Sequence, residues 1–191
     1  MTTKIILTGF MATGKSAVGH LVAKQLGWRF TDTDREIVAR AGKPIATIFA
    51  EHGEPHFRAL ERETIAMLVN DPRLCPQSGN PLPEVISTGG GALVDERNCA
   101  MLKRAGIVMC LTARPEVIAA RVGRSATRRP KLLEGNLPLE ERIRDLMAER
   151  AAAYARADIT IDTSDLSPVQ VAERIIDAFV AREKARCRPS A

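Results

Sequence analysis

A short segment near the start of the chain has the composition of a phosphate-binding loop. Gly9-Phe10-Met11-Ala12-Thr13-Gly14-Lys15-Ser16 fits the pattern GxxxxGK[ST]. Its two glycines allow successive backbone N–H groups to surround an anion, and the N-terminus of a following helix adds positive potential. The ammonium group of Lys15 can reach the β and γ phosphates of a nucleotide, and the hydroxyl of Ser16 can bind Mg²⁺. The alternative is a plain glycine turn that opens a helix.

An acidic pair, Asp32-Thr33-Asp34, follows the next short apolar segment. An enzyme that transfers a phosphoryl group needs one carboxylate near Mg²⁺ and often another near the acceptor hydroxyl. Residues two apart on an extended segment point the same way, so we expect the pair to serve one site. The alternative is that Asp32 or Asp34 only caps the following helix, because Asp is a preferred N-cap residue.

Two further groups of residues have spacings that suit ligand binding. Gly89-Gly90-Gly91 follows an apolar segment, and three glycines add no packing, which favours close approach of the backbone to a ligand. Arg58 and Glu61 are three apart on an expected helix and share a face. Glu61 can hold the guanidinium of Arg58, whose fork matches a carboxylate. For Arg58 alone, a surface ion pair with Glu61 or Glu54 is the usual alternative.

Apolar segments that alternate with helical patterns must position these residues. We expect strands at residues 5–8, 29–31, 85–87, 107–111 and 159–161. We expect helices at residues 15–26, 34–41, 53–69, 95–104, 115–121, 138–157 and 168–182, with a short helical piece from residue 44. In the 53–69 helix, the residues expected to face the core are Phe57, Leu60, Met67 and Leu68.

This alternation predicts an α/β fold with a parallel sheet covered by helices on both faces. Ligands of such sheets bind at the carboxyl ends of the strands. Thr8-Gly9, Thr31-Asp32 and Thr88-Gly89 all fall at expected strand ends. The sequence therefore places all three motifs along one edge of the sheet.

Composition narrows the function classes. The chain has 191 residues, 45% of them hydrophobic, and a net charge of +5, which suits a single globular domain. We expect no membrane span, because no apolar run approaches the ~20 residues that one needs. Only 4% of residues are aromatic, which disfavours stacking on nucleic-acid bases. The N-terminus reads as a strand and not as a leader, so we expect a cytoplasmic protein, and we expect a monomer.

Taken in order along the chain, the motifs resemble those of shikimate kinase. The resemblance runs from Ile5 to about Val180. Beside the phosphate loop and Asp32-Thr33-Asp34, the residues that carry it are Phe49, Gly53-Glu54-Pro55-His56-Phe57-Arg58, Glu61, Thr88-Gly89-Gly90-Gly91-Ala92, Arg129-Pro130, Arg150 and Tyr154.

The resemblance implies a three-layer phosphate-loop kinase fold of the nucleoside-monophosphate-kinase type, with a five-stranded parallel sheet. It implies an acceptor-binding region at about residues 33–61 and a lid at about residues 122–138. The reaction would be transfer of the γ-phosphate of MgATP to the 3-hydroxyl of shikimate, with Mg²⁺ as cofactor.

The resemblance also implies roles for single residues. Asp34 would hold the acceptor hydroxyl and act as its base, and Asp32 would orient Mg²⁺ together with Ser16. Arg58 and Arg150 would bind the carboxylate of shikimate. The other implied acceptor residues are Phe49, Phe57, Glu61, Gly89, Gly90 and Gly91, where core packing is an equal alternative for the two phenylalanines.

On the nucleotide side, the implied residues include two arginines. Arg129 would reach the transferring phosphate from the lid, and Arg121 would lie near adenine. The family usually reads Arg-Pro-Leu-Leu at the lid, whereas this chain reads Arg129-Pro130-Lys131-Leu132-Leu133, with Arg128 beside it. The remaining ATP-binding positions are Gly9, Ala12, Thr13, Gly14, Lys15, Ser16 and Ala17.

Two other functions compete with this interpretation. Another phosphate-loop kinase, such as a gluconate kinase, also carries an aspartate pair, but we expect a His-Pro soon after it. Here Asp34 is followed by Arg35-Glu36-Ile37. A regulatory nucleotide-binding module without turnover would keep Lys15 but would not need Asp34, Arg58 and Arg129 together.

Overall fold

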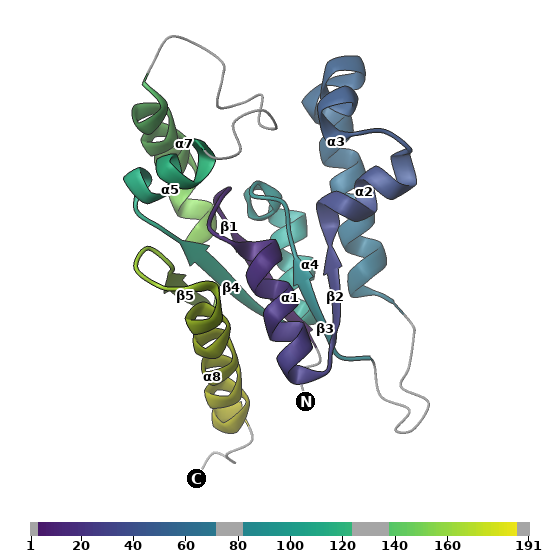
Figure 1. Cartoon of the computed structure of the whole chain (residues 1–191). Coiled ribbons are helices and arrows are strands. Elements are labelled where there is room, and N and C mark those ends of the chain that lie inside the picture. Colours follow the sequence, from purple (N-terminus) through teal and green to yellow (C-terminus); the bar gives the residue numbers. More distant parts are fainter. Residues whose placement is uncertain (1–3, 72–81, 124–137, 187–191) are drawn as a thin grey trace.

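The computed structural model describes residues 4–71, 82–123 and 138–186 of the chain, and these residues form one sheet with helices on both sides (Figure 1). The five strands are all parallel and lie in the order β2-β3-β1-β4-β5. They are β1 Lys4–Gly9, β2 Arg29–Asp32, β3 Glu84–Ser87, β4 Ile107–Thr112 and β5 Ile159–Asp162. The predicted five-stranded parallel sheet is therefore confirmed, with each strand within about two residues of its expected bounds.

The helices follow the strands as the sequence pattern predicts. They are α1 Lys15–Leu26, α2 Thr33–Ala41, α3 Ile45–Val69, α4 Glu96–Ala105, α5 Pro115–Gly123, α7 Leu139–Tyr154 and α8 Pro168–Arg186. A 3-10 turn, η1 Ala92–Val94, was not expected from the sequence and connects the glycine segment to α4. The expected lid coincides in large part with residues 124–137, which lie outside the described residues.

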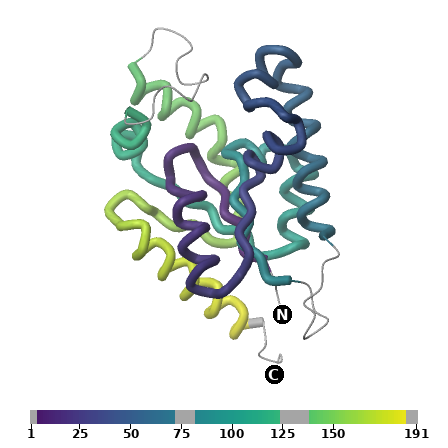
Figure 2. Tube along the Cα trace, turned by 45° about the vertical axis from the view of Figure 1, so that its right-hand side comes forward, coloured from purple at the N-terminus to yellow at the C-terminus, as the bar shows by residue number. Residues whose placement is uncertain are grey.

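Alternation along the strands divides the core into two layers. On β1, Ile5 and Leu7 pack with α1 and α8 on one face of the sheet. Ile6, between them, packs with α3 and α4 on the other face. Because successive side chains of a strand point to opposite faces, a strand that is apolar at every position must be covered on both sides. The tube in Figure 2 shows α8 and α1 on the one face of the sheet.

The region expected to bind the acceptor contains α2 and part of α3, and these two helices pack against each other. Within α3, Gly53 has φ 76° and ψ 175°, so the helix is interrupted there, and Pro55 begins the second part. The sequence predicted this break as two separate helices. Met67 was expected in the core, but it is 45% exposed. It lies beside the buried stripe of the helix and not on it, because that stripe follows Glu61, Thr64, Ile65 and Leu68.

A buried polar network stabilises the edge of the sheet at which β1 and β3 begin. The ammonium group of Lys4 donates to the carbonyl of Leu68 at 2.8 Å and to the carboxylate of Glu84 at 3.3 Å. The hydroxyl of Thr31 donates to the other carboxylate oxygen of Glu84 at 2.6 Å. These bonds join β1, β2 and β3 to the end of α3. Within the described part of the chain, no helix has both the length and the apolar character that crossing a bilayer requires.

Candidate active site

The phosphate loop lies between β1 and α1, at the carboxyl edge of the sheet, with α5 and α7 on one side and α2 and α3 on the other (Figure 1). Gly9 has φ 128°, and a Cβ at this position would lie 2.0 Å from the carbonyl oxygen of Leu111, so only glycine fits. Ala12 also has a positive φ, of 60°, and is the one non-glycine residue with this feature among those described. The hydroxyl of Thr13 donates to the Phe10 carbonyl at 2.8 Å and stabilises the turn.

Lys15 and Ser16 begin α1 and face a cavity of about 320 Å³. The ammonium group of Lys15 donates to the carbonyls of Gly9 and Phe10, both at 2.9 Å, and so lies over the loop. The walls of the cavity are formed by Met11, Ala12, Gly14, Lys15, Ser16, Ala17, Asp32, Asp34, Ser87, Thr88 and Gly90. The phosphate loop and the acidic pair therefore open onto the same space.

Asp32 ends β2 and has two functions in the local structure. Its Oδ1 accepts hydrogen bonds from the backbone N–H groups of Asp34 and Arg35, which makes it the N-cap of α2. Its Oδ2 accepts from the hydroxyl of Ser16 at 2.5 Å. Helix capping, the alternative considered from the sequence, is thus true of Asp32, but its second oxygen still faces the cavity and Ser16.

These two oxygen ligands suit Mg²⁺, which prefers hard oxygen donors and keeps several of its waters. Within the ranges that the structure describes, no group of three or more His, Cys, Asp or Glu side chains is placed to hold a metal ion. A cation held by Ser16 and Asp32 would therefore take its other ligands from phosphate oxygens and water.

Asp34 lies in the first turn of α2 and not on an extended segment, so the argument from strand geometry was wrong. It still lines the cavity together with Asp32, because α2 begins at Thr33, the residue that directly follows the end of β2. Burial and the neighbouring charge of Asp32 raise the pKa of Asp34 to about 6, against the opposing effect of Lys15. A carboxylate with such a pKa is suited to accept a proton near neutral pH.

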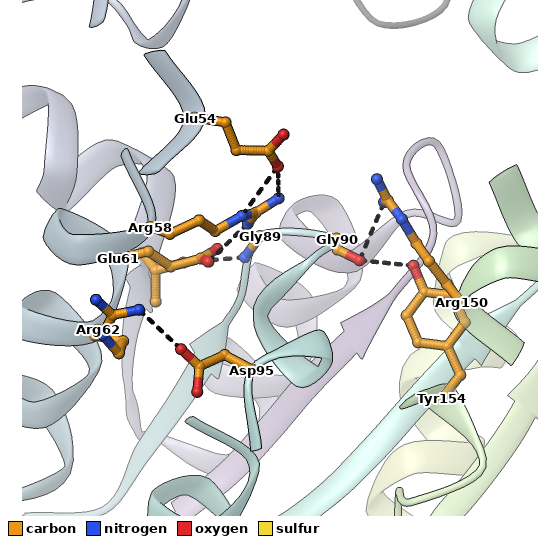
Figure 3. Close-up of polar contacts among 10 residues, drawn as sticks. Glu54, Arg58, Glu61, Arg62, Gly89, Gly90, Asp95, Arg150 and Tyr154 are labelled. Atoms are coloured by element: carbon orange, nitrogen blue, oxygen red, sulfur yellow. Dashed lines mark hydrogen bonds and ion pairs between the residues drawn. The ribbon is translucent and has the colours of Figure 1, made fainter. Parts of the chain in front are cut away.

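Arg58 and Glu61 form the centre of a charged cluster on α3, the acceptor cluster expected from the sequence (Figure 3). Arg58 Nη1 donates to Glu61 Oε2 at 2.7 Å, and Nη2 donates to Glu54 Oε1 at 2.9 Å. Glu61 is fully buried, whereas the Arg58 side chain is 24% exposed. Burial therefore desolvates both groups, Glu61 more than Arg58, and it raises the pKa of Glu61 despite the nearby guanidinium.

The glycine segment lies against this cluster. A Cβ on Gly91 would be 2.7 Å from both Nη atoms of Arg58, and a Cβ on Gly89 would be 2.8 Å from Glu61 Oε1 and 2.9 Å from Asp34 Oδ1. Those two carboxylate oxygens are buried and have no hydrogen-bond partner among the described residues. Asp34 thus connects the nucleotide cavity with the Arg58–Glu61 cluster.

The other expected acceptor residues divide into two groups. Arg150, on α7, lies on the far side of the glycine segment from Arg58, and its Nη1 donates to the Gly90 carbonyl at 3.3 Å. Phe49 and Phe57 pack together with ring centroids 4.7 Å apart, in the apolar cluster between α2 and α3. Neither phenylalanine lines the cavity beside the phosphate loop, so their contact with an acceptor stays a prediction.

Two arginines, Arg121 and Arg129, were expected on the nucleotide side. Arg129 lies outside the described residues. Arg121, on α5, donates to the Ala12 carbonyl at 3.3 Å and to the Thr163 carbonyl at 2.7 Å. It therefore joins the phosphate loop to the loop after β5 and holds these two loops together.

Several residues around the cavity were given no role from the sequence. Ser87 and Thr88 line it from the end of β3. Thr88 was already placed at a strand end, where ligands are expected to bind, and the same rule could have found Ser87. The hydroxyl of Thr33 accepts from the backbone N–H of Gly89 at 3.0 Å, and the hydroxyl of Tyr154 donates to the Gly90 carbonyl at 2.7 Å. No local pattern signals these last two contacts, because each joins segments more than fifty residues apart.

Comparisons with known proteins agree with this geometry. The family model "Shikimate kinase" matches residues 11–180. A shikimate kinase of Thermoanaerobacter pseudethanolicus is 41% identical over 180 residues, which are 94% of this chain and 98% of the relative. One of Geobacter metallireducens is 44% identical over 171 residues, 90% of this chain and 88% of the relative.

Solved structures give the same result. The shikimate kinase from Acinetobacter baumannii in complex with shikimate superposes with a TM-score of 0.84 at 32% identity, covering 95% of each chain. A gluconokinase from Sinorhizobium meliloti reaches a TM-score of 0.59 at 13% identity and covers 98% of each chain, a similarity that extends to the fold alone. This chain therefore belongs to the shikimate kinase family.

Proposed function

We propose that this protein transfers the γ-phosphate of MgATP to the 3-hydroxyl group of shikimate, giving shikimate 3-phosphate and ADP. The observation that carries the proposal is the position of Asp34. It lines the cavity beside Lys15 and Ser16, and its buried oxygen lies next to Glu61 at the Arg58 cluster. A hydroxyl group bound to Asp34 would therefore face a phosphate bound to the loop.

In the proposed mechanism, the backbone N–H groups of the loop and the ammonium group of Lys15 bind the β and γ phosphates. Ser16 and Asp32 would hold Mg²⁺, which when bound neutralises charge on the phosphate oxygens. On the acceptor side, Arg58 and Arg150 bind the carboxylate of shikimate. Gly89, Gly90 and Gly91 allow the ring to approach the backbone closely.

The transfer then needs little covalent participation by the protein. The acceptor oxygen bonds to the γ-phosphorus as the bond to the β-phosphate oxygen breaks, and ADP leaves with that electron pair. Asp34 takes the proton of the acceptor hydroxyl, for which a pKa of about 6 is suitable. Most of the acceleration would come from positioning and from neutralisation of charge. We assign Arg129 to the transferring phosphate and Arg121 to the adenine side.

We further propose that the protein acts as a monomer in the cytoplasm and binds neither nucleic acid nor membranes. In the described ranges, the large apolar side chains that are exposed are Met67, Val94, Val169 and Val180. Met67 lies on α3 and Val94 on η1, whereas Val169 and Val180 lie on α8, eleven residues apart. Cys99 and Cys110 are buried free thiols, as is usual in a reducing compartment.

The decisive experiment measures ADP release, coupled to an optical assay, with MgATP and either shikimate or gluconate. We expect turnover with shikimate and none with gluconate. Turnover with gluconate alone would favour the other phosphate-loop kinase considered from the sequence. Nucleotide binding without turnover on either compound would support a regulatory module instead.

A further inference from the structure

The carbonyl group of Gly90 is held by two side chains of one helix (Figure 3). The Tyr154 hydroxyl donates to this oxygen at 2.7 Å, and Arg150 Nη1 donates at 3.3 Å. Both residues belong to the last turn of α7 and, being four apart, share a face of the helix. The shorter bond is that of Tyr154, a residue to which the mechanism above gives no role.

The direction of this carbonyl group determines the direction of an amide that faces the acceptor site. A trans peptide is planar, so the C=O of Gly90 and the N–H of Gly91 point in opposite directions across the same unit. No cis peptide occurs among the described residues. Because the Gly90 oxygen points to α7, the N–H of Gly91 points away from α7. Gly91 itself lies against the guanidinium of Arg58, on the side of the loop that faces α3.

The Gly90–Gly91 peptide is the central unit of a turn, which the Ala92 N–H closes by donating to the Gly89 carbonyl at 3.1 Å. Glycine has no side chain to pack and has the widest choice of backbone angles of any residue. A turn of this kind can hold its central peptide in either of two opposite orientations, and glycine permits both, so groups outside the turn select the orientation. Arg150 is poorly suited to this task alone, since its bond is longer and its guanidinium is also assigned to the carboxylate of the substrate.

Tyr154 has the properties that a fixed anchor requires. Its ring packs against the apolar cluster of Phe10, Ala113, Ile118, Val122 and Ile143, between α5, α7 and the phosphate loop. Burial raises the pKa of Tyr154 to about 12, so the phenol keeps its proton and stays a donor. Packing alone would be served equally well by phenylalanine, and the hydroxyl is the part that reaches Gly90.

We propose that Tyr154 is a positioning residue for the acceptor site: its hydroxyl fixes the Gly90–Gly91 peptide so that the Gly91 N–H is presented to the acceptor. Tyr154 touches neither substrate and acts only through this peptide unit. The inference rests on the proposed function, because it assumes that shikimate binds between the glycine segment and Arg58.

The test is the variant Tyr154→Phe, which removes one oxygen atom and keeps the ring. We expect the KM for shikimate to rise about fivefold, the effect of losing one neutral hydrogen bond, while the KM for MgATP stays within about twofold. Calorimetric titration with shikimate in the absence of nucleotide should show the same weakening. If the hydroxyl had only a structural role, its loss would lower thermal stability, and the KM for shikimate would not rise more than the KM for MgATP.

Thr31→Val is the matched control, because it deletes one buried hydroxyl bond, to Glu84, outside the cavity. It should lower the melting temperature and leave both KM values unchanged. An unchanged KM for shikimate in Tyr154→Phe, or an equal rise in both KM values, would overturn the inference while the proposed function stands. If the wild-type protein released no ADP with shikimate, the proposed function would fail and the inference with it.

Discussion

Replacing Glu61 by Gln tests the acceptor cluster without changing its volume. In the wild-type protein, the buried Glu61 carboxylate accepts a hydrogen bond of 2.7 Å from Arg58. A hydrogen bond between charged groups contributes roughly 1.5–3 kcal/mol. Glutamine keeps an acceptor oxygen but loses the charge, so we take the lower value, about 1.5 kcal/mol, as the loss in positioning Arg58. That free energy corresponds to an increase of about tenfold in the KM for shikimate.

Glu61→Gln should also change how the free energy of unfolding depends on pH. Because burial raises the pKa of Glu61 above its value in the unfolded chain, the neutral carboxyl group stabilises the fold at low pH. That contribution is lost as the pH rises through the raised pKa. Glutamine does not ionise, so the free energy of unfolding of Glu61→Gln should fall less between about pH 5 and pH 8 than that of the wild type. Urea denaturation at both pH values measures this difference.

The matched control is Glu54→Gln, which removes charge from the other carboxylate that binds Arg58. Glu54 is 45% exposed, and ion pairs at the surface contribute only about 0–1 kcal/mol. We therefore expect a rise of about twofold in the KM for shikimate, measured by ADP release. If Glu54→Gln raised this KM as much as Glu61→Gln did, or if Glu61→Gln left it unchanged, burial would not be what gives the Arg58–Glu61 pair its importance.

Three further predictions concern the nucleotide loop, the base and the glycine segment. Lys15→Ala should lower kcat by about 10²–10³ in the ADP-release assay with little change in melting temperature; near-normal turnover would contradict the loop assignment. Because Asp34 has its pKa raised to about 6 and must be ionised to accept a proton, kcat/KM for shikimate should fall as the pH drops through that value; a profile that stays flat down to about pH 5 would exclude it as the base. Gly89→Ala brings a Cβ within 2.8 Å of Glu61 and 2.9 Å of Asp34, so the KM for shikimate should rise more than that for MgATP; equal rises would place Gly89 outside the acceptor site.

Features that depend on neighbouring residues were readily predicted from the sequence. The phosphate loop is a local pattern, and its flanking strand and helix have clear periodicities, so β1 and α1 were expected almost as observed. The break at Gly53 was also expected, because glycine followed by Pro55 interrupts a helix. The rule that ligands meet the carboxyl ends of parallel strands then brought Asp32 and the glycine segment to one edge.

Features that depend on contacts between distant segments were not predicted. The argument that Asp32 and Asp34 point the same way treated both as extended, although a helix was expected from residue 34 and capping by Asp32 was considered only as an alternative. The bond from Tyr154 to Gly90 and those from Arg121 to Ala12 and Thr163 join elements whose distance is set by the packing of α5 and α7. Hydrophobic periodicity carries no information about such bonds.

The order of the strands has a consequence for how the protein is made. β1 lies in the middle of the sheet, yet both of its neighbours, β3 and β4, are synthesised later. The bond between Lys4 and Glu84 can form only after Glu84 has been synthesised, 80 residues further along the chain. At translation rates of about 5–20 residues per second this takes roughly 4–16 s. During that interval the apolar residues Ile5, Ile6 and Leu7 emerge from the ribosome without a partner strand. We therefore expect this apolar segment to be prone to aggregation until β3 and β4 have been synthesised.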